Sequence, residues 1–178
     1  MTSAFEHLSP AYPGKAAWGT ASRLRAWQVE ALRQYQDAAP TDFLCVATPG
    51  AGKTTFALRV ARELLAAGVV KRIIVVAPTE HLKVQWADAA ARVGVQLDPG
   101  LGGSKRGRSR DFDGVVVTYA GVAARMFHYQ ALTSHFKTLV IFDEIHHAGD
   151  SKSWGDAVAD AFAYATRRLS LTGTPFRS

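Results

Sequence analysis

The stretch "FLCVATPGAGKTT", Phe43 to Thr55, passes from an apolar run through a glycine-rich turn into a helical pattern. Its last nine residues fit the phosphate-loop pattern, with Ala47 in the position of the first glycine. Small residues let the backbone curl until its N–H groups face a phosphate, and the next helix points its positive N-terminus there. The lysine supplies a charge for the β and γ phosphates, and the following hydroxyl serves Mg²⁺. The residues expected to bind a nucleotide here are Pro49, Gly50, Ala51, Gly52, Lys53, Thr54 and Thr55.

Strands and helical patterns alternate along the rest of the chain. Apolar runs without polar alternation favour strands covered on both faces, as in a parallel sheet, and they occupy residues 43–47, 73–77, 115–118, 139–142 and 169–172. Helical patterns lie at residues 54–67, 79–93, 120–133 and 154–166, with an amphipathic helix ahead of them at 24–35. This alternation predicts an α/β fold in which a parallel sheet is sandwiched between helices.

The composition is that of an ordinary globular domain. At 178 residues, 48% apolar and 20% charged, the chain is long enough for one domain with a real core. The net charge of +6 suits a polyanionic partner, although many basic proteins bind no nucleic acid. The single cysteine, Cys45, lies in an apolar run and fits a reducing compartment. The first residues do not resemble a signal peptide. Every apolar run is shorter than a membrane span, which needs about 20 residues. We expect a cytoplasmic protein with no membrane partner.

Two adjacent carboxylates follow the run at 139–142, in "LVIFDEIHH". Ligands of an open parallel sheet bind beyond the carboxyl ends of its strands, so Asp143 and Lys53 are expected to share one crevice. Asp143 would hold Mg²⁺ through its water shell, together with the Thr54 hydroxyl. Glu144 would polarise the water that attacks the γ-phosphorus. A zinc site built from the two carboxylates and two histidines is an alternative, although consecutive positions rarely converge on one tetrahedral ion.

The sequence resembles the first RecA-like domain of superfamily 2 helicases and translocases. "DEIHH" (143–147) is similar to their motif II, a relative of the DEAD/DEAH box in its DExH form, and "ATPGAGKTT" (47–55) matches motif I, the Walker A box. "LRAWQ" (24–28) resembles the adenine-sensing Gln motif, although Ala26 replaces the usual proline. "APTEHLKVQW" (77–86) resembles motif Ia, and "VVVTYAGV" (115–122) the strand-end motif around Thr118. "LTGTPFR" (171–177) resembles motif III of the branch that holds restriction-enzyme motor subunits and excision-repair translocases.

The resemblance implies an architecture and roles for further residues. It implies a motif III strand between the strands of motifs I and II, with residues 1–22 as an irregular extension and residues 23–178 as the RecA-like domain. The second RecA-like domain, which provides an arginine finger in the family, is expected to be absent from this chain. Arg25 and Gln28 would bind the nucleotide, and His146, a member of the catalytic set with Lys53, Asp143 and Glu144, would couple the site to the second domain. The residues implied for nucleic acid are Pro78, Thr79 and Thr118, and those implied for interdomain coupling are Thr172 and Thr174.

We therefore expect the ATP-binding motor domain of a nucleic-acid-dependent ATPase, with ATP and Mg²⁺ as cofactors and with DNA favoured over RNA. The alternatives are an ATP-dependent clamp or sensor that never translocates, and a P-loop ATPase with no nucleic-acid role. The basic cluster Lys105, Arg106, Arg108 and Arg110 is either a solvated loop or a nucleic-acid contact. Gln28 has a solvated alternative, and Trp27 and Trp86 are expected in the core rather than under a base. Adenine stacking on Tyr12 or Trp18 is the weaker possibility.

Overall fold

A parallel sheet forms the centre of the molecule. The computed structural model describes residues 24–48, 50–100, 112–149 and 152–173. Within them six strands, all parallel, follow the order β1-β6-β5-β2-β4-β3. Their bounds are β1 Asp42–Val46, β2 Arg72–Ala77, β3 Leu97–Asp98, β4 Gly114–Thr118, β5 Thr138–Phe142 and β6 Arg167–Thr172. The motif III strand, β6, lies between β1 and β5, so the expected strand order is confirmed.

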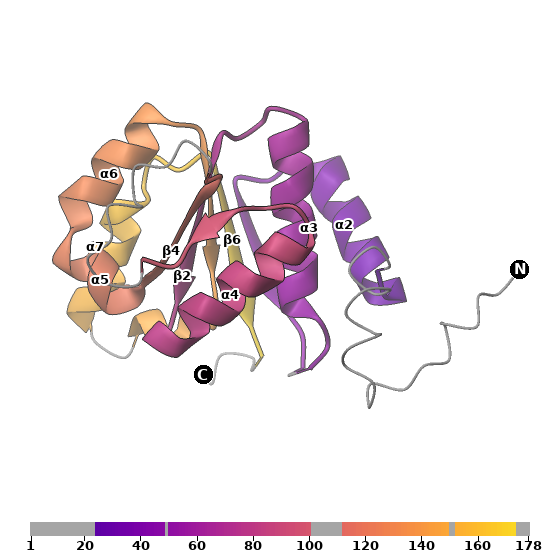
Figure 1. Ribbon diagram of the computed structural model, residues 1–178, viewed down its shortest axis with the longest axis horizontal. Coiled ribbons are helices and arrows are strands. Elements are labelled where there is room, and N and C mark those ends of the chain that lie inside the picture. The colour runs from indigo at the N-terminus through magenta and orange to yellow at the C-terminus, as the bar shows by residue number, and fades with distance from the viewer. Residues whose placement is uncertain (1–23, 49, 101–111, 150–151, 174–178) are drawn as a thin grey trace, which may run out of the picture.

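Helices cover both faces of this sheet, as Figure 1 shows. One face carries α2 (Ala26–Ala38), α3 (Lys53–Ala66) and α4 (Glu80–Arg92), and the other carries α5 (Tyr119–Ala124), α6 (Met126–His135) and α7 (Lys152–Ala161). A short 3₁₀ helix, η3 (Ile145–Gly149), follows β5. The helix expected at 24–35 is confirmed as α2, whose Leu32 and Tyr35 are buried. The three-layer α/β prediction is therefore confirmed.

The central strands bury both of their faces. In β2, Val75 packs into the core beneath α2, α3 and α4, while its neighbours Ile74 and Val76 pack into the core beneath α5, α6 and α7. Every residue of β5 is buried as well. A continuous apolar run is the pattern that such doubly covered strands require, because successive side chains point to opposite faces. The expectation of two-sided burial is confirmed for these strands.

The same expectation is wrong at β1. Leu44 and Val46 are 48% and 52% exposed, while Cys45 between them is buried. β1 is an edge strand, and its open face lies on the side of α5, α6 and α7. Among the described residues, the core cluster on that side takes its strand residues from β2, β4 and β5, not from β1. One face of β1 is therefore apolar yet uncovered.

Two predicted helices have different bounds. The helix expected at 120–133 is two helices, because Arg125 leaves helical geometry with φ −131° and ψ 38°. The helix expected at 154–166 ends at Ala161. The next residue, Phe162, is fully buried and packs edge-on against Phe142 with ring centroids 5.6 Å apart. The two-residue strand β3 is too short to give a periodic signal.

Backbones approach closely where β4 starts. Gly114 pairs with Ile73 of β2, and a Cβ at Gly114 would lie 1.7 Å from the Ile73 carbonyl oxygen. Glycine is therefore required at this position by the close approach of β2. This pairing fixes the register that brings Thr118, at the end of β4, opposite Ala77, at the end of β2. The carboxyl ends of both strands thus reach the same edge of the sheet.

Candidate functional site

The phosphate loop lies between β1 and α3, where α2 holds its backbone. Gly50 and Gly52 have φ angles of 78° and 93°, which glycine adopts without steric cost. Arg25 Nη1 donates to Gly50 O at 3.0 Å, and Trp27 Nε1 donates to Ala51 O at 2.9 Å. A third side chain, that of Gln28 in α2, donates to the carbonyl of Gly52, so the carbonyls of three successive loop residues accept hydrogen bonds.

That third side chain is Gln28, which is 2% exposed. Its Nε2 donates to Gly52 O at 2.7 Å, and its Oε1 accepts from Arg25 N at 2.6 Å. A Cβ on Gly52 would lie 2.5 Å from Gln28 Nε2, so the loop has no room for a side chain there. The solvated alternative for Gln28 is therefore wrong, and the residue is a buried link between α2 and the phosphate loop.

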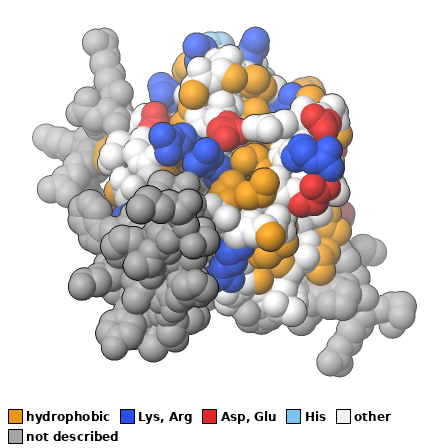
Figure 2. Space-filling model, turned by 90° about the vertical axis from the view of Figure 1, so that its right-hand side faces the viewer, with side chains coloured by type: hydrophobic (Ala, Val, Ile, Leu, Met, Phe, Trp, Pro, Cys, Tyr) orange, Lys and Arg blue, Asp and Glu red, His pale blue; other side chains and the backbone are white. Residues whose placement is uncertain are grey.

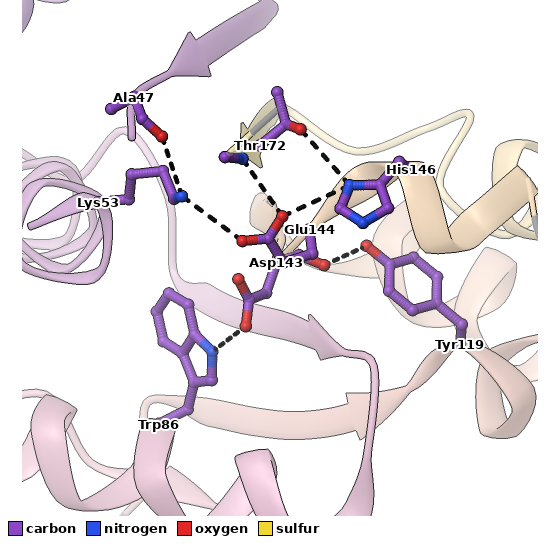
Figure 3. A network of polar contacts seen from close by, with 9 residues as sticks. Ala47, Lys53, Trp86, Tyr119, Asp143, Glu144, His146 and Thr172 are labelled. Carbon is purple, nitrogen blue, oxygen red and sulfur yellow. Dashed lines mark hydrogen bonds and ion pairs between the residues drawn. The ribbon is translucent and has the colours of Figure 1, made fainter. Parts of the chain in front are cut away.

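Lys53, the first residue of α3, points across the crevice toward β5. Its Nζ donates to Ala47 O at 3.2 Å and lies 3.5 Å from Glu144 Oε1 (Figure 3). The lysine side chain is 10% exposed, so its charge is largely shielded from bulk water. Thr54 and Thr55 follow in the first turn of α3 and are half-buried. The first N–H groups of a helix have no intrahelical acceptor, which makes this turn suited to an anion.

Asp143 and Glu144 follow β5 and their carboxylates meet different partners. Asp143 Oδ2 accepts from Trp86 Nε1 at 2.9 Å, and its backbone oxygen accepts from Tyr119 Oη at 2.8 Å (Figure 3). Glu144 has a left-handed φ of 47°, an uncommon conformation for a non-glycine residue. Its carboxylate faces Lys53 instead. The two adjacent carboxylates thus contact different residues.

Glu144 is also the centre of contacts with motif III. Glu144 Oε2 accepts from Gly173 N at 3.3 Å and lies 3.4 Å from His146 Nδ1. The same ring nitrogen lies 3.5 Å from Thr172 Oγ1 at the end of β6. The end of β6 and the acidic box after β5 are therefore joined through one carboxylate and one imidazole.

Burial shapes the electrostatics beside this site. Tyr119 is 1% exposed, and burial, followed by the negative charges of Asp143 and Glu144, raises the pKa of its phenol. The phenol therefore stays a neutral O–H donor. Burial also raises the pKa of the Cys45 thiol, as expected of a buried small apolar residue. Among the described residues, no group of three or more His, Cys, Asp or Glu side chains could hold a metal ion such as zinc.

The residues implied for nucleic acid lie at one edge of the sheet, next to this crevice. Pro78 and Thr79 follow β2, and Thr118 ends β4. Both hydroxyls cap helices, since Thr79 Oγ1 accepts from Leu82 N at 3.3 Å and Thr118 Oγ1 accepts from Gly121 N at 3.1 Å. Capping alone accounts for these two side chains structurally. The sequence-predicted residues outside the described part of the chain are Tyr12, Trp18, Pro49, Lys105, Arg106, Arg108, Arg110 and Thr174.

Three aromatic residues of the site were not expected in it. Trp86 is buried, as predicted, but its indole N–H reaches Asp143, and Trp27 lies partly buried beside Phe56. Tyr119 follows Thr118 directly. The available signal was chemical: a buried Trp or Tyr needs a partner for its N–H or O–H.

The strand order, the phosphate loop and the acidic box after β5 define a RecA-like domain of the superfamily 2 helicases. The chain belongs to the family described as type III restriction enzyme, res subunit, whose model matches residues 21–177. An uncharacterized protein of Mycobacterium tuberculosis is 59% identical over 155 residues, which are 87% of this chain and 26% of that protein. The chain thus spans about a quarter of the length of that relative.

Solved structures share the fold. The SWI2/SNF2 ATPase core of Sulfolobus solfataricus in complex with dsDNA has a TM-score of 0.67 at 18% identity, covering 87% of this chain and 33% of that chain. The Hef helicase domain of Pyrococcus furiosus has a TM-score of 0.65 at 22% identity, covering 88% and 34%. Within the described residues, no helix combines the length and apolarity needed to cross a membrane.

Proposed function

We propose that this chain is the ATP-binding motor domain of a nucleic-acid-dependent ATPase, a helicase or translocase that hydrolyses ATP with Mg²⁺ when paired with a second RecA-like domain. The observation that supports this most directly is the 3.5 Å contact between Lys53 Nζ and Glu144 Oε1. It joins the phosphate-loop cation and the proposed catalytic carboxylate across one crevice. A nucleotide phosphate would compete with Glu144 for Lys53 and so release the carboxylate for water.

The residues of the crevice fit a magnesium ion chemically. Mg²⁺ prefers oxygen ligands and keeps several waters, and a hydroxyl and a carboxylate are available at Thr54 and Asp143. When bound, the ion would neutralise charge on the phosphates. The Glu144 carboxylate is paired with Lys53, whereas Asp143 Oδ2 accepts a hydrogen bond from the neutral indole of Trp86. This supports Asp143 rather than Glu144 as the metal-binding carboxylate.

The remaining residues of the site have distinct proposed tasks. Lys53 binds the β and γ phosphates, and Glu144 polarises the attacking water. His146, 3.5 Å from Thr172, couples the nucleotide site to the second domain. The loop residues proposed to bind the nucleotide are Pro49, Gly50, Ala51, Gly52, Thr54 and Thr55, with Arg25 and Gln28 behind them, and Thr172 and Thr174 are the proposed coupling residues of motif III.

Nucleic acid is proposed to cross the edge formed by the ends of β2 and β4. Thr79 and Thr118 lie there on neighbouring strands in register. DNA is favoured, since the family is described by a restriction enzyme and the Sulfolobus neighbour was solved with dsDNA. Pro78 and the basic residues Lys105, Arg106 and Arg108 are the other proposed contacts. Residues 23–178 are proposed to form one RecA-like domain, and residues 1–22 are proposed to be an extension.

The proposal is tested by measuring ATP hydrolysis of the full-length protein that contains these residues, with and without Mg²⁺ and double-stranded DNA. We expect hydrolysis that needs Mg²⁺ and rises with DNA. Lys53→Ala should abolish most ATP affinity while the circular-dichroism spectrum stays unchanged, because Lys53 serves the ligand. Lys71→Ala is the matched control, since Lys71 is exposed and lies before β2, at the opposite edge of the sheet. Equal ATP affinity of the two variants would contradict the proposal. Hydrolysis without directional movement along DNA would point to a clamp.

A further inference from the structure

Trp27 contacts the phosphate loop through its single polar atom. Its Nε1 donates to Ala51 O at 2.9 Å, between the loop carbonyls that accept from Arg25 and Gln28. An indole has one N–H donor and no acceptor, so this bond uses the whole hydrogen-bonding capacity of the side chain. Trp27 therefore contacts the loop as well as the core cluster against which its ring packs.

Rings from both elements that flank the loop pack in line with this indole. The ring centroids of Trp27 and Phe56, in α3, lie 5.9 Å apart, and those of Phe56 and Phe43, in β1, lie 6.2 Å apart. We call these three rings the aromatic row. Phe56 is fully buried, and tilted aromatic pairs at such separations are favourable. The indole N–H is thus presented to the loop from a packed position on α2, which lies beside α3 (Figure 1).

The Ala51 carbonyl belongs to the same peptide unit as the Gly52 N–H. In a planar trans peptide these two groups point in opposite directions, so a carbonyl held toward Trp27 turns the N–H away from it. Among the described residues the Gly52 N–H has no acceptor, whereas the Ala51 N–H already donates to Thr48 O at 3.0 Å. Trp27 therefore orients a backbone donor of the loop that a phosphate oxygen can use.

We propose that Trp27 is a positioning residue of the phosphate loop, whose indole N–H holds the peptide between Ala51 and Gly52 so that the Gly52 N–H faces the nucleotide phosphates. The inference rests on the proposed function, because it requires a nucleotide at this loop. In this role Trp27 touches no atom of the nucleotide. Its contribution to affinity is therefore the same whether or not a base is attached to the phosphates, unlike that of Gln28, whose proposed contacts include adenine.

The test uses the full-length protein with Trp27→Phe, which removes the indole N–H and keeps an aromatic ring. Titration calorimetry measures the affinity for two ligands, a non-hydrolysable ATP analogue and inorganic tripolyphosphate, each with Mg²⁺. We expect both affinities to fall by the same factor of about 3–10, the effect of one lost neutral hydrogen bond. Single-turnover hydrolysis at saturating ATP should stay within about twofold of the wild type, because a loss shared by ground state and transition state leaves the chemical step unchanged.

Phe43→Leu is the matched control, since it removes a ring from the same aromatic row and leaves every donor to the loop in place. It should lower the temperature of thermal unfolding and leave both affinities unchanged. If Trp27→Phe does not fold by circular dichroism, benzothienylalanine at position 27 replaces it in the test. In that side chain a sulfur takes the place of the indole N–H, and the fused ring keeps its shape.

Three results would overturn the inference. Weaker binding of the ATP analogue with wild-type affinity for tripolyphosphate would indicate a contact with the base. Wild-type affinity for both ligands would show that the indole N–H does not matter, and an equal loss in Phe43→Leu would show a purely structural role. The proposed function stands in each case, whereas a wild-type protein that binds neither ligand would overturn the proposed function and the inference together.

Discussion

Asp143 and Glu144 are adjacent in the sequence, but their side chains contact different residues. The left-handed φ of 47° at Glu144 is the backbone feature that accompanies this separation. Such a conformation costs an L-residue roughly 1–2 kcal/mol, and strain of this kind concentrates at functional sites. The Asp143 carboxylate meets an indole, and the Glu144 carboxylate meets Lys53, His146 and Gly173. Two chemically similar side chains can therefore hold a metal and activate water separately.

This separation leads to opposite expectations for two conservative variants of the full-length protein. Glu144→Gln keeps the shape and loses the charge, so it should bind Mg-ATP about as well as the wild type. Its hydrolysis should slow by about 10²–10⁴-fold, as for a lost acid–base group. Asp143→Asn should instead weaken nucleotide binding in a way that depends on Mg²⁺. Nucleotide affinity at several Mg²⁺ concentrations and single-turnover hydrolysis distinguish them. Reversed behaviour of the two variants would mean that the assigned roles are exchanged.

The sequence predicted the polar residues of the site but not their aromatic supports. Lys53 and Asp143 were placed in one crevice because both follow strands, and the Lys53–Glu144 contact agrees with that placement. Trp86 and Tyr119 reach Asp143 from 57 and 24 positions away along the chain. Neither pairing has a local pattern, because it depends on where α4 and α5 pack. The roles of all these residues stay predictions.

At the scale of elements, α2 and its N-cap residue support the phosphate loop with three donors. Arg25, Trp27 and Gln28 each donate to a different carbonyl of residues 50–52. Gln28 also accepts from the Arg25 amide, so its side chain already makes two hydrogen bonds. A glutamine side chain offers two N–H donors and one oxygen with two lone pairs. These two bonds use one N–H and one lone pair of Gln28, so the proposed contact with adenine would use the other N–H or the other lone pair.

Replacement of Gln28 separates its support of the loop from recognition of the base. Gln28→Ala should lower the free energy of unfolding by about 1–3 kcal/mol, because a buried partner of Gly52 is lost. Weakened ATP binding with an unchanged preference for ATP over GTP would indicate loop support alone. Loss of that preference would indicate adenine recognition as well. Gln34→Ala is the control, since Gln34 lies on the exposed side of the same helix. Equal stability and affinity in both variants would contradict any role of Gln28.

The presence of each strand and helix was easier to predict than the residues at which it ends and the faces that are buried. The five predicted strands match β1, β2, β4, β5 and β6 within two residues, since doubly buried runs carry a strong apolar signal. No proline or glycine lies within three residues of the break at Arg125, so no breaker residue predicts it. The open face of β1 follows from its edge position, which only the strand order reveals. Tertiary context decided each of these features.

At the scale of the molecule, the net charge of +6 favours a polyanionic partner, but some basic side chains are already paired with acidic ones. The side formed by α2 carries acidic and basic side chains with apolar ones between them (Figure 2). There Arg33 pairs with Glu30 at 2.6 Å and with Asp37 at 3.5 Å, so its charge is compensated locally. Exposed pairs of this kind contribute little to stability. The proposed nucleic-acid edge lies elsewhere, at the carboxyl ends of β2 and β4.

The activity of the whole protein is expected to exceed that of this chain by a large factor. The chain spans 26% of its Mycobacterium tuberculosis relative, and the proposed mechanism requires a second RecA-like domain. An arginine finger from such a domain is worth about 10³–10⁵ in rate. Among the described residues, the site shows acids, one lysine and a histidine around the crevice, with Arg25 turned to a loop carbonyl. The stabilisation of the transition state would therefore come largely from outside this domain.

We accordingly expect the isolated 178-residue chain to bind ATP weakly and to hydrolyse it at least about 10³-fold more slowly than the full-length protein with DNA. Single-turnover hydrolysis at saturating ATP measures the chemical step, so weak binding does not mask the comparison. The Glu144→Gln full-length protein gives the background rate, and circular dichroism with thermal unfolding verifies that the isolated chain is folded. DNA should not accelerate the isolated chain, because the proposed coupling runs from His146 to a residue of a second RecA-like domain. A folded isolated chain with robust DNA-stimulated turnover would show that these residues suffice for the motor chemistry. In that case an arginine of this chain would have to stabilise the transition state.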